Sequence, residues 1–396
     1  MDPSAIARVR SSIGQWNEDH LKEYIDHDWN IHRWITAYEG NEEETIKVLR
    51  RHLNNRNTMG LSHLPEIEPE CPIMEKHAPL SILGRNHPDD NKVTLWELTG
   101  LLDIHGLVEN IRISPFMKSR FRWMERVHRE VVKEEKRTGR QSGGLLIMDL
   151  NQLRFSPSLL SVIGGSFLLP YSLSYSISSG PYRIMWGTLF EQYPQMIQEI
   201  VIINAPTFVN LLYQTCIPFI PADYKSRITI CSSSSPSLTL IKCLHPQIIP
   251  SQYITEESPY TNPDIPKPVS PFPKAEMLSV QLDSVSVPAG GQVYLKLKLN
   301  AGETIDIYTK HEQEMTVFWF YSIDDTKDSS NWREIIAGCE RPALSTIDRS
   351  RWIVPENGYY YVRYGNEKAW FLSVSIKYRY ESDQRGKITP IEQFTL

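Results

Sequence analysis

The chain is 396 residues long, and its 41% hydrophobic content supports well-packed cores in two or three domains. Its formal net charge of −5 at pH 7 leaves none of the excess positive charge with which proteins hold nucleic acid, so nucleic acid is not an expected partner. The first residues lack the basic and apolar runs of a secretory signal, and the five cysteines are scattered with no Cys-x-x-Cys pair. We therefore expect a cytoplasmic protein.

Residues 28–53 carry the pattern of two short amphipathic helices. Their apolar stripes are Ile31, Trp34, Ile35 and Tyr38 in the first helix, and Ile46, Leu49 and Leu53 in the second. Asn41, with Glu44 three residues later, has the spacing of a capping box at the start of the second helix. The basic residues of this region are Arg50, Arg51 and Arg56. We interpret them as a solvated face in preference to a contact with a lipid headgroup.

Strands and helices alternate from residue 93 to residue 231. The expected strands are the apolar or β-branched runs 93–97, 144–149, 199–203 and 227–231. Between the first two, Ser114 and Pro115 open a long helix that ends near Arg137, before Gly139. Its apolar stripe and charged far face are typical of an ordinary packed surface helix. This alternation predicts an α/β domain with a largely parallel sheet.

No charged residue occurs between Arg154 and Arg183. The length of this stretch is nearly enough to span a membrane, but its serines, Gly164, Gly165 and Pro170 make it a poor hydrophobic span. We therefore do not expect it to cross a bilayer.

A helix is expected directly after the strand 199–203, with Asn204 as its N-cap and Pro206 in its first turn. One apolar face consists of Phe208, Leu211, Leu212, Cys216 and Phe219, and the opposite face is mostly apolar too, with Val209, Tyr213 and Ile217. A helix that is apolar nearly all round needs two apolar neighbours. It is either a crossover helix between two protein layers or a helix with a ligand cavity on one side.

Residues 256–274 form the clearest domain boundary, because six prolines fall between residues 259 and 273 and make a semi-extended linker. Beyond it, Gln292–Leu299 alternates strictly between apolar and polar residues, as in a strand with one buried face. Further strands are expected at 304–308, 316–321, 358–364 and 370–380. Short antiparallel strands at this spacing predict an all-β sandwich over 275–382, followed by a tail, 383–396.

Several of these segments resemble the CRAL-TRIO lipid-transfer family. Its YP…INAP…PF…KI signature corresponds to Tyr193, Pro194, Asn204, Ala205, Pro206, Pro218, Phe219 and Ile228. Residues 28–53 resemble the helical module that precedes such domains, and the VPAGG and PENGYYYVRYGN sequences resemble a GOLD domain. This order is similar to that of the supernatant protein factor and tocopherol-associated family. It implies a helical module at 1–75, a lipid-binding domain at 76–255 and a GOLD sandwich after the linker.

In this family the helix after the NAP triplet is a mobile gate over a lipid cavity. The resemblance implies that gate and cavity are lined by Phe208, Leu211, Leu212, Thr215, Cys216 and Phe219. Members that bind phosphatidylinositol carry a Glu after the YP pair and a Lys before the last strand, where this chain has Gln195 and Arg227. Arg227 can pair with phosphate or be an ordinary surface charge, and Gln195 offers no carboxylate to sugar hydroxyls. Relative to the family, residues 164–180 look like an insert, either a loop or a gene-model artefact.

The sequence contains no nucleophile elbow, His-Glu-x-x-His zinc motif, phosphate-binding loop or dinucleotide-binding glycine pattern. We therefore expect no enzyme activity, metal ion or cofactor. The expected function is cytosolic binding and transfer, or presentation, of a hydrophobic lipid such as a phospholipid or a tocopherol- or squalene-like molecule. The GOLD domain would dock peripherally on a membrane surface or on a protein partner. The alternatives are a signalling or Golgi-traffic adaptor that keeps the fold without transfer, and an α/β enzyme with an unrecognised site.

Overall fold

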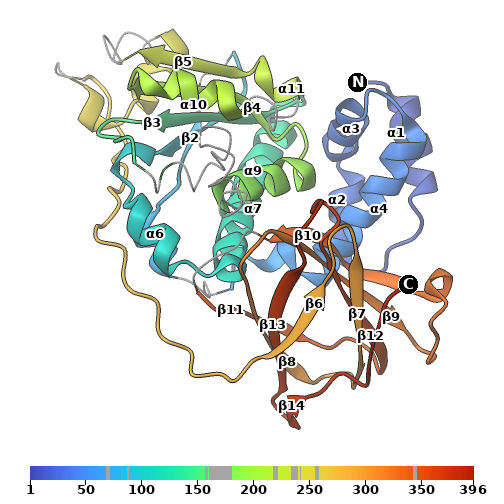
Figure 1. Cartoon of the computed structure of the whole chain (residues 1–396). Coiled ribbons are helices and arrows are strands. Elements are labelled where there is room, and N and C mark those ends of the chain that lie inside the picture. The colour runs from blue at the N-terminus through green and yellow to red at the C-terminus, as the bar shows by residue number, and fades with distance from the viewer. Residues whose placement is uncertain are drawn as a thin grey trace. The chain divides into compact units, whose positions relative to one another are not determined.

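The computed structural model describes residues 1–67, 72–86, 89–156, 159, 181–216, 222–232, 240, 242–254, 258–341 and 346–396. Within these ranges the chain divides into two compact units. The first contains Met1–Asp103, Ser119–Ser156 and Trp186–Phe272, and the second contains Ile104–Lys118, the described residues Leu159 and Pro181–Met185, and Pro273–Leu396. Figure 1 shows the helices and central sheet of the first unit and the sandwich of the second.

The N-terminal region is helical. Its helices are α1 Pro3–Ser12, α2 Asp19–Asp26, α3 Asp28–Ala37 and α4 Glu42–Thr58. α3 and α4 confirm the helices expected at 28–53, and Asn41 caps α4 by accepting a hydrogen bond from the Glu44 amide at 3.1 Å. The predicted stripes of α3 and α4 pack with apolar residues of α1 and α2 in one cluster. The helices therefore share a core that none of them could bury alone.

A sheet with strand order β1-β2-β3-β4-β5 forms the centre of the first unit. Its strands are β1 Ser81–Arg85, β2 Lys92–Glu97, β3 Gly143–Asp149, β4 Ile197–Ala205 and β5 Ile228–Ser232. β2 to β5 are parallel and confirm the predicted strands, whereas the antiparallel β1 is an addition to them. The helices that follow α4 are α5 Ile73–His77, α6 Ile104–Asn110, α7 Ile113–Thr138, α9 Pro181–Gln192, α10 Phe208–Cys216 and α11 Ala222–Lys225, and short 3-10 helices lie at Leu61–His63, Thr99–Leu101, Pro246–Ile248 and Ser251–Tyr253.

The two faces of this sheet are covered differently. On one face, a buried cluster joins Trp96, Leu145, Ile147, Val201 and Ile203 of the strands to Leu240, Leu244, Ile249 and Ile265. Residues one position further along a strand point to the opposite face. There Met148, Ile202 and Ile230, which stand in register on β3, β4 and β5, are only half-buried. The same face also carries Leu95, Leu146 and Ile200, which are buried, so its half-buried side chains lie toward the carboxyl ends of the strands.

The proline-rich segment expected as a linker at 256–274 is anchored to the first unit. Asn262 donates hydrogen bonds to the backbone oxygens of Pro246 and Ile249 at 2.7 and 2.9 Å. The Val269 amide donates to the Lys76 carbonyl at 2.9 Å. The side chains of Ile265 and Phe272 are buried. The segment is thus extended, as its prolines predict, and held in place as far as Phe272.

The second unit is a sandwich of two antiparallel sheets, which confirms the predicted all-β fold. One sheet has the order β10-β9-β12-β7-β15 and the other β11-β8-β13-β14, with β6 also paired to β13. The strands are β6 Asp283–Val287, β7 Gln292–Leu299, β8 Thr304–His311, β9 Met315–Ser322, β10 Arg333–Arg341, β11 Asp348–Ile353, β12 Gly358–Gly365, β13 Val374–Ser382, β14 Gly386–Ile388 and β15 Glu392–Phe394, with a 3-10 helix at Ser329–Asn331. Residues 383–396, expected as a tail, thus contribute a strand to each sheet.

Two features of the second unit depart from the prediction. The strand expected at 370–380 begins only at Val374, because the strands that pair with it, β6 and β8, reach no further than that residue. In addition, Ile104–Lys118 belongs to this unit. The Ser114 amide and hydroxyl donate to the Asp348 carboxylate at 2.9 and 2.7 Å, and Thr346 donates to the Ile111 carbonyl. Helix α7, predicted correctly in length, therefore begins in one unit and ends in the other.

The uncharged stretch 154–183 is described only in part. The segment 164–180, interpreted above as an insert, lies outside the described ranges, and α9 begins directly after it at Pro181. Within the ranges that are described, no helix is both long enough and apolar enough to cross a membrane.

Candidate functional site

The end of β4 carries the NAP triplet, and its geometry corrects one prediction. Asn204 and Ala205 are still part of β4, and α10 begins only at Phe208, so Asn204 is not the N-cap of this helix. Asn204 has a φ of 53°, in the left-handed region that asparagine tolerates better than most residues. Its side-chain amide donates to Asp149 Oδ1 at 2.8 Å. That bond fixes Asn204 against β3, which leaves its side chain unable to cap a helix.

Asp149, at the end of β3, collects three donors. Its carboxylate accepts hydrogen bonds from the Asn151 amide and the Asn204 side chain, both at 2.8 Å, and from the Tyr253 hydroxyl. Burial and the bond to Asp149 raise the pKa of Tyr253 above its usual value, so this hydroxyl stays a donor. A buried carboxylate with three donors needs no further partner. The carboxyl ends of β3 and β4 therefore form a fixed edge beside which α10 starts.

Helix α10 lies over one face of the sheet, roughly along its strands (Figure 1). Val209 is buried in a small cluster with Leu150 and Ala205, against which Phe208 and Ile202 pack. The Phe208 ring lies 5.6 Å from that of Phe155. Of the other residues expected to line a gate, Leu211, Leu212, Thr215 and Cys216 belong to α10 by their backbone but their side chains lie outside the described part, as does Phe219 entirely. The first turn of the helix thus touches the half-buried aliphatic face of the sheet.

The two residues expected at a headgroup, Gln195 and Arg227, are brought together. An Arg227 Nη donates to Gln195 Oε1, and the other donates to the Ile197 carbonyl at 3.0 Å. The guanidinium also lies over the Tyr224 ring, 4.8 Å from its centroid. Gln195 has a φ of 58° and is buried, whereas Arg227 is half-buried. The structure thus places the two residues in contact and adds the Tyr224 ring beneath the guanidinium, while their role at a headgroup stays a prediction.

Arg56 corrects the expectation of a solvated basic face. It is 3% exposed and makes a two-pronged ion pair with Glu125 of α7, with N–O distances of 2.8 and 2.5 Å. Tyr193, from the YP pair, donates its hydroxyl to the same carboxylate. Burial and the adjacent Glu125 charge hold the pKa of Tyr193 well above its usual value. The charged pair can be buried here because the two side chains bond each other through two parallel hydrogen bonds.

A second buried pair lies further along α7. Arg33 pairs with Glu135, whose carboxylate also accepts the Ser142 amide at 2.8 Å and contacts His27 Nε2 at 2.8 Å. The charged side of α7 is therefore partly buried, and the helix is not the ordinary surface helix that its pattern predicted. The sequence did hold a signal: Glu125, His128 and Glu135 follow three residues of the apolar stripe, Phe121, Met124 and Val131, by four positions each. That spacing places them along one edge of the stripe.

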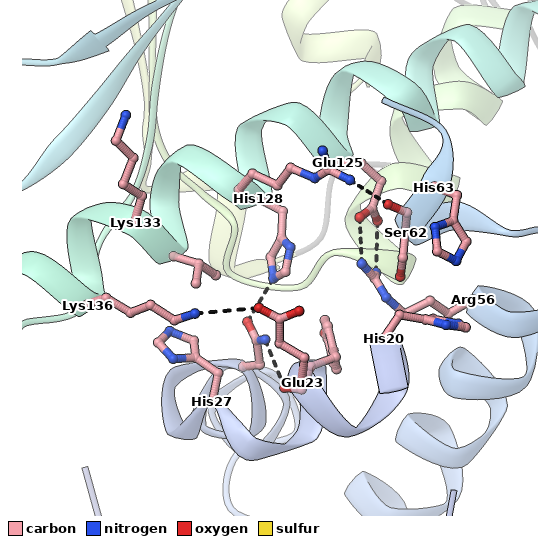
Figure 2. Close-up of a pocket in the computed structure, with 14 residues that line it drawn as sticks. His20, Glu23, His27, Arg56, Ser62, His63, Glu125, His128, Lys133 and Lys136 are labelled. Carbon is pink, nitrogen blue, oxygen red and sulfur yellow. Dashed lines mark hydrogen bonds and ion pairs between the residues drawn. The ribbon is translucent and has the colours of Figure 1, made fainter. Parts of the chain in front are cut away.

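A polar cavity of about 510 Å³ lies between these helices (Figure 2). Its walls include His20, His27, His63 and His128, the Arg56–Glu125 pair and, at its edge, Lys133 and Lys136. His128 Nε2 lies 3.0 Å from the Asn30 amide oxygen, and burial together with the nearby Arg56 lowers the pKa of His128 well below its usual value. The charged and imidazole groups of this cavity offer hydrogen bonds to water or to a small polar solute. Sequence reasoning missed this cavity because its histidines lie far apart in the chain.

A metal ion is not expected at this cavity. Among the described residues, no group of three or more His, Cys, Asp or Glu side chains has the arrangement to hold one. The histidines instead make side-chain contacts within the protein, such as the ring pair of His20 and His63 with centroids 5.0 Å apart.

Comparison with known proteins agrees with this architecture. Residues 87–253 match the CRAL/TRIO domain family, and residues 268–389 match the F28H7_8_C-like, C-terminal domain family. The chain is 27% identical over 402 residues to the CRAL-TRIO domain-containing protein F28H7.8 of Caenorhabditis elegans, which covers 98% of this chain and 92% of the relative. It is 23% identical over 262 residues to protein C34C12.6 of the same organism, covering 63% and 61%. The crystal structure of Sfh5 is 14% identical, with a TM-score of 0.46, and covers 70% of this chain and 95% of that one.

Proposed function

We propose that this protein, whose residues 87–253 form a CRAL/TRIO domain, binds a hydrophobic lipid in a gated cavity and transfers or presents it. CRAL/TRIO domains are lipid-binding and typically non-enzymatic. The observation that carries the proposal is the half-buried row of Met148, Ile202 and Ile230 beside α10. Strands of a parallel sheet are normally covered on both faces. Ile202 and Ile230 are covered in part by the cluster around Val209 of α10, and a lipid chain over the row would complete that cover.

The energetics of extraction explain why such a face is useful. Each methylene buried away from water contributes about 0.8 kcal/mol, so an acyl chain gains on the order of 10 kcal/mol from the bilayer that holds it. A carrier must offer an apolar surface of comparable extent and a door that closes over it. In this proposal the sheet row is the floor, and Phe208, Leu211, Leu212, Thr215, Cys216 and Phe219 line the cavity and gate.

The polar end of the lipid would meet the Gln195–Arg227 pair. The Arg227 guanidinium lies over the Tyr224 ring, and one Nη donates a hydrogen bond to the Ile197 carbonyl. These two contacts hold the guanidinium in place. If a phosphate oxygen took the place of Gln195 Oε1 as the acceptor, the Arg227 hydrogen bond would become charge-assisted. Gln195 brings an amide where inositol binding would favour a carboxylate. We therefore propose a phospholipid, or a tocopherol- or squalene-like molecule, without selectivity for phosphatidylinositol.

The C-terminal sandwich would act as a GOLD-like docking domain. Its antiparallel sheets enclose a core of their own, so it can be presented to a membrane or a protein partner as a formed domain. In this proposal the protein works in the cytosol and visits membranes peripherally. The adaptor alternative predicts the same fold with no lipid passenger.

The test combines native mass spectrometry with lipid transfer between vesicles. The purified full chain is expected to retain a hydrophobic passenger and to move labelled phospholipid from donor to acceptor vesicles. Leu212→Asp should lose transfer with a near-normal circular dichroism spectrum, because a charge on the cavity face must be desolvated only when the gate closes over lipid. Leu212→Met, of similar volume, is the control and should transfer almost normally. A chain without passenger or transfer would favour the adaptor, and unfolding of the Asp variant would make α10 a plain crossover helix.

A further inference from the structure

The loop between β12 and β13 exposes three large apolar side chains in succession. Trp370 is 86% exposed, Phe371 81% and Leu372 46%. Single exposed apolar residues are common on proteins, but contiguous ones mark interaction sites. The sequence pattern predicted that these residues belong to a strand, in which alternate side chains would be buried. Because β13 begins only at Val374, all three lie beyond the sandwich core.

The base of this loop is fixed by Asn366, which is buried. Its side-chain amide donates to the Leu372 carbonyl at 2.9 Å and to the Pro288 carbonyl at 3.3 Å. Its backbone amide donates to the Gly291 carbonyl at 2.9 Å, and its carbonyl accepts the Gly290 amide at 3.0 Å. The Asn366 side chain thus closes the loop on itself and ties it to the β6–β7 turn. Presenting the apolar tip costs little conformational entropy, because its base is already ordered.

The charges around the tip are paired with one another. Lys368 lies 3.5 Å from Glu314, and Glu367 lies 3.5 Å from Arg363 and accepts the Thr316 hydroxyl at 2.8 Å. The β6–β7 turn beside the loop, residues 288–291, carries no charge. Both charged residues of the loop itself, Glu367 and Lys368, thus have an ion-pair partner. What the loop offers is an uncharged tip of two aromatic rings and one aliphatic side chain.

We propose that Trp370, Phe371 and Leu372 form an anchor that inserts into the interfacial region of a zwitterionic phospholipid bilayer. Aromatic side chains favour the membrane interface, and a bilayer accepts a projecting tip without a matching socket. A lipid carrier must touch a membrane to load and unload, so this inference rests on the proposed function and gives it a point of contact. Since the surrounding charges are paired, binding should depend on apolar insertion and hardly on anionic lipid.

The test is flotation of the full chain with phosphatidylcholine vesicles. The variant Trp370→Ala with Phe371→Ala should bind these vesicles about tenfold more weakly or worse, because it loses two rings from the inserted surface. Raising the ionic strength from about 0.1 to about 1 M should leave wild-type binding nearly unchanged. Ile323→Ala is the matched control: Ile323 is 72% exposed but follows Ser322, which pairs with Tyr359 at the opposite end of β12. It should bind like the wild type.

The outcomes separate this anchor from the proposed function. A double variant that floats like the wild type overturns the anchor, and if that variant also loses self-association in analytical ultracentrifugation, the tip is a protein interface instead. Binding that needs anionic vesicles and vanishes at high salt also overturns it. The passenger seen by native mass spectrometry should remain in the double variant, because the loop lies outside the lipid-binding domain. A wild type without passenger that still floats through this tip would reject the carrier and keep the anchor.

Discussion

At the scale of single residues, the charges that matter to the fold are the buried ones. Arg56 and Glu125 are 3% and 1% exposed, while Arg8 and Glu42 form an ion pair at 2.6 Å on the surface. Water screens the surface pair, and its side chains lose freedom when they meet, so it adds little. The buried pair was taken out of water during folding, and each member depends on the other.

We expect Arg56→Met to destabilise the protein by about 3–5 kcal/mol, because it leaves the Glu125 carboxylate buried without its counter-charge. Adding Glu125→Gln should recover part of this loss, since the amide is neutral and still accepts the Tyr193 hydroxyl. Urea unfolding at neutral pH measures both effects. Arg8→Met is the surface control and should leave the unfolding midpoint unchanged. A single variant as stable as the double one would show that Arg56 stabilises by packing alone.

Two buried histidines make stability depend on pH. Burial, reinforced by the nearby Arg56, lowers the pKa of His52 to about 3 and that of His128 well below its usual value. In the unfolded chain both titrate near pH 6.5, so below that pH the unfolded state binds more protons than the folded one. Their stabilising contribution is therefore complete above about pH 6.5 and declines as the pH falls toward about 3.

The expected slope is about 1.4 kcal/mol per pH unit for each such histidine once the pH is well below 6.5. Unfolding free energies measured between pH 7.5 and pH 5 should show it. His52→Gln removes one titrating group while offering an amide to Gln192, the partner of His52 Nδ1 at 3.1 Å. The variant should have a shallower acid slope. Parallel curves for the two proteins would mean that His52 is not kept neutral by the fold.

At the scale of elements, the helices and strands with strongly periodic apolar residues were predicted correctly, whereas single residues at their ends were weaker guides. The parallel strands, α3, α4, α7 and the sandwich follow from apolar spacing within each segment. Helix α1 was not predicted from the sequence, because it buries only Ala5, Ile6 and Val9 and so has a weak apolar pattern. Its stability comes from packing on the other helices. Residues 370–372 look like a strand start, and only the limits of β6 and β8 show that they are not.

In the candidate site, too, some residues could be identified from the sequence and others could not. The resemblance to the family singled out Gln195 and Arg227 together, and the structure brings them into contact. The role of Asn204 could not be predicted, because an asparagine two positions before a proline suits both a helix cap and a left-handed strand end. Asp149, fifty-five positions earlier in the chain, decides between them by binding the side-chain amide. The buried partners of Arg56 are likewise distant in sequence, so its environment could not be read locally.

At the scale of the whole molecule, the domain boundary lies after the proline-rich segment. Bonds from Asn262 and Val269 and the buried Phe272 hold that segment on the first unit, whereas Met277 is 94% exposed. A protease needs backbone that can leave the surface. Between residues 258 and 280, limited chymotrypsin digestion of the native chain should therefore cut near Met277 before it cuts within residues 258–272. Mass spectrometry of the earliest fragments locates the cut, and a first cut within 258–272 would show that the anchoring bonds do not persist.

The two fragments should stay together after that cut. The N-terminal fragment keeps Ile104–Lys118, and this segment belongs to the same unit as the sandwich. Its Ser114 gives the Asp348 carboxylate two hydrogen bonds, at 2.9 and 2.7 Å, in a largely buried setting where losing the acceptor leaves both donors unpaired. The nicked wild type should elute as one species in size-exclusion chromatography, and nicked Asp348→Ala should dissociate more readily. Asp328→Ala, which removes an acceptor used only by residues of its own loop, such as Ser330 and Asn331, should behave like the wild type. Immediate separation of the wild-type fragments would mean that Ile104–Lys118 does not bind the sandwich once the chain is open.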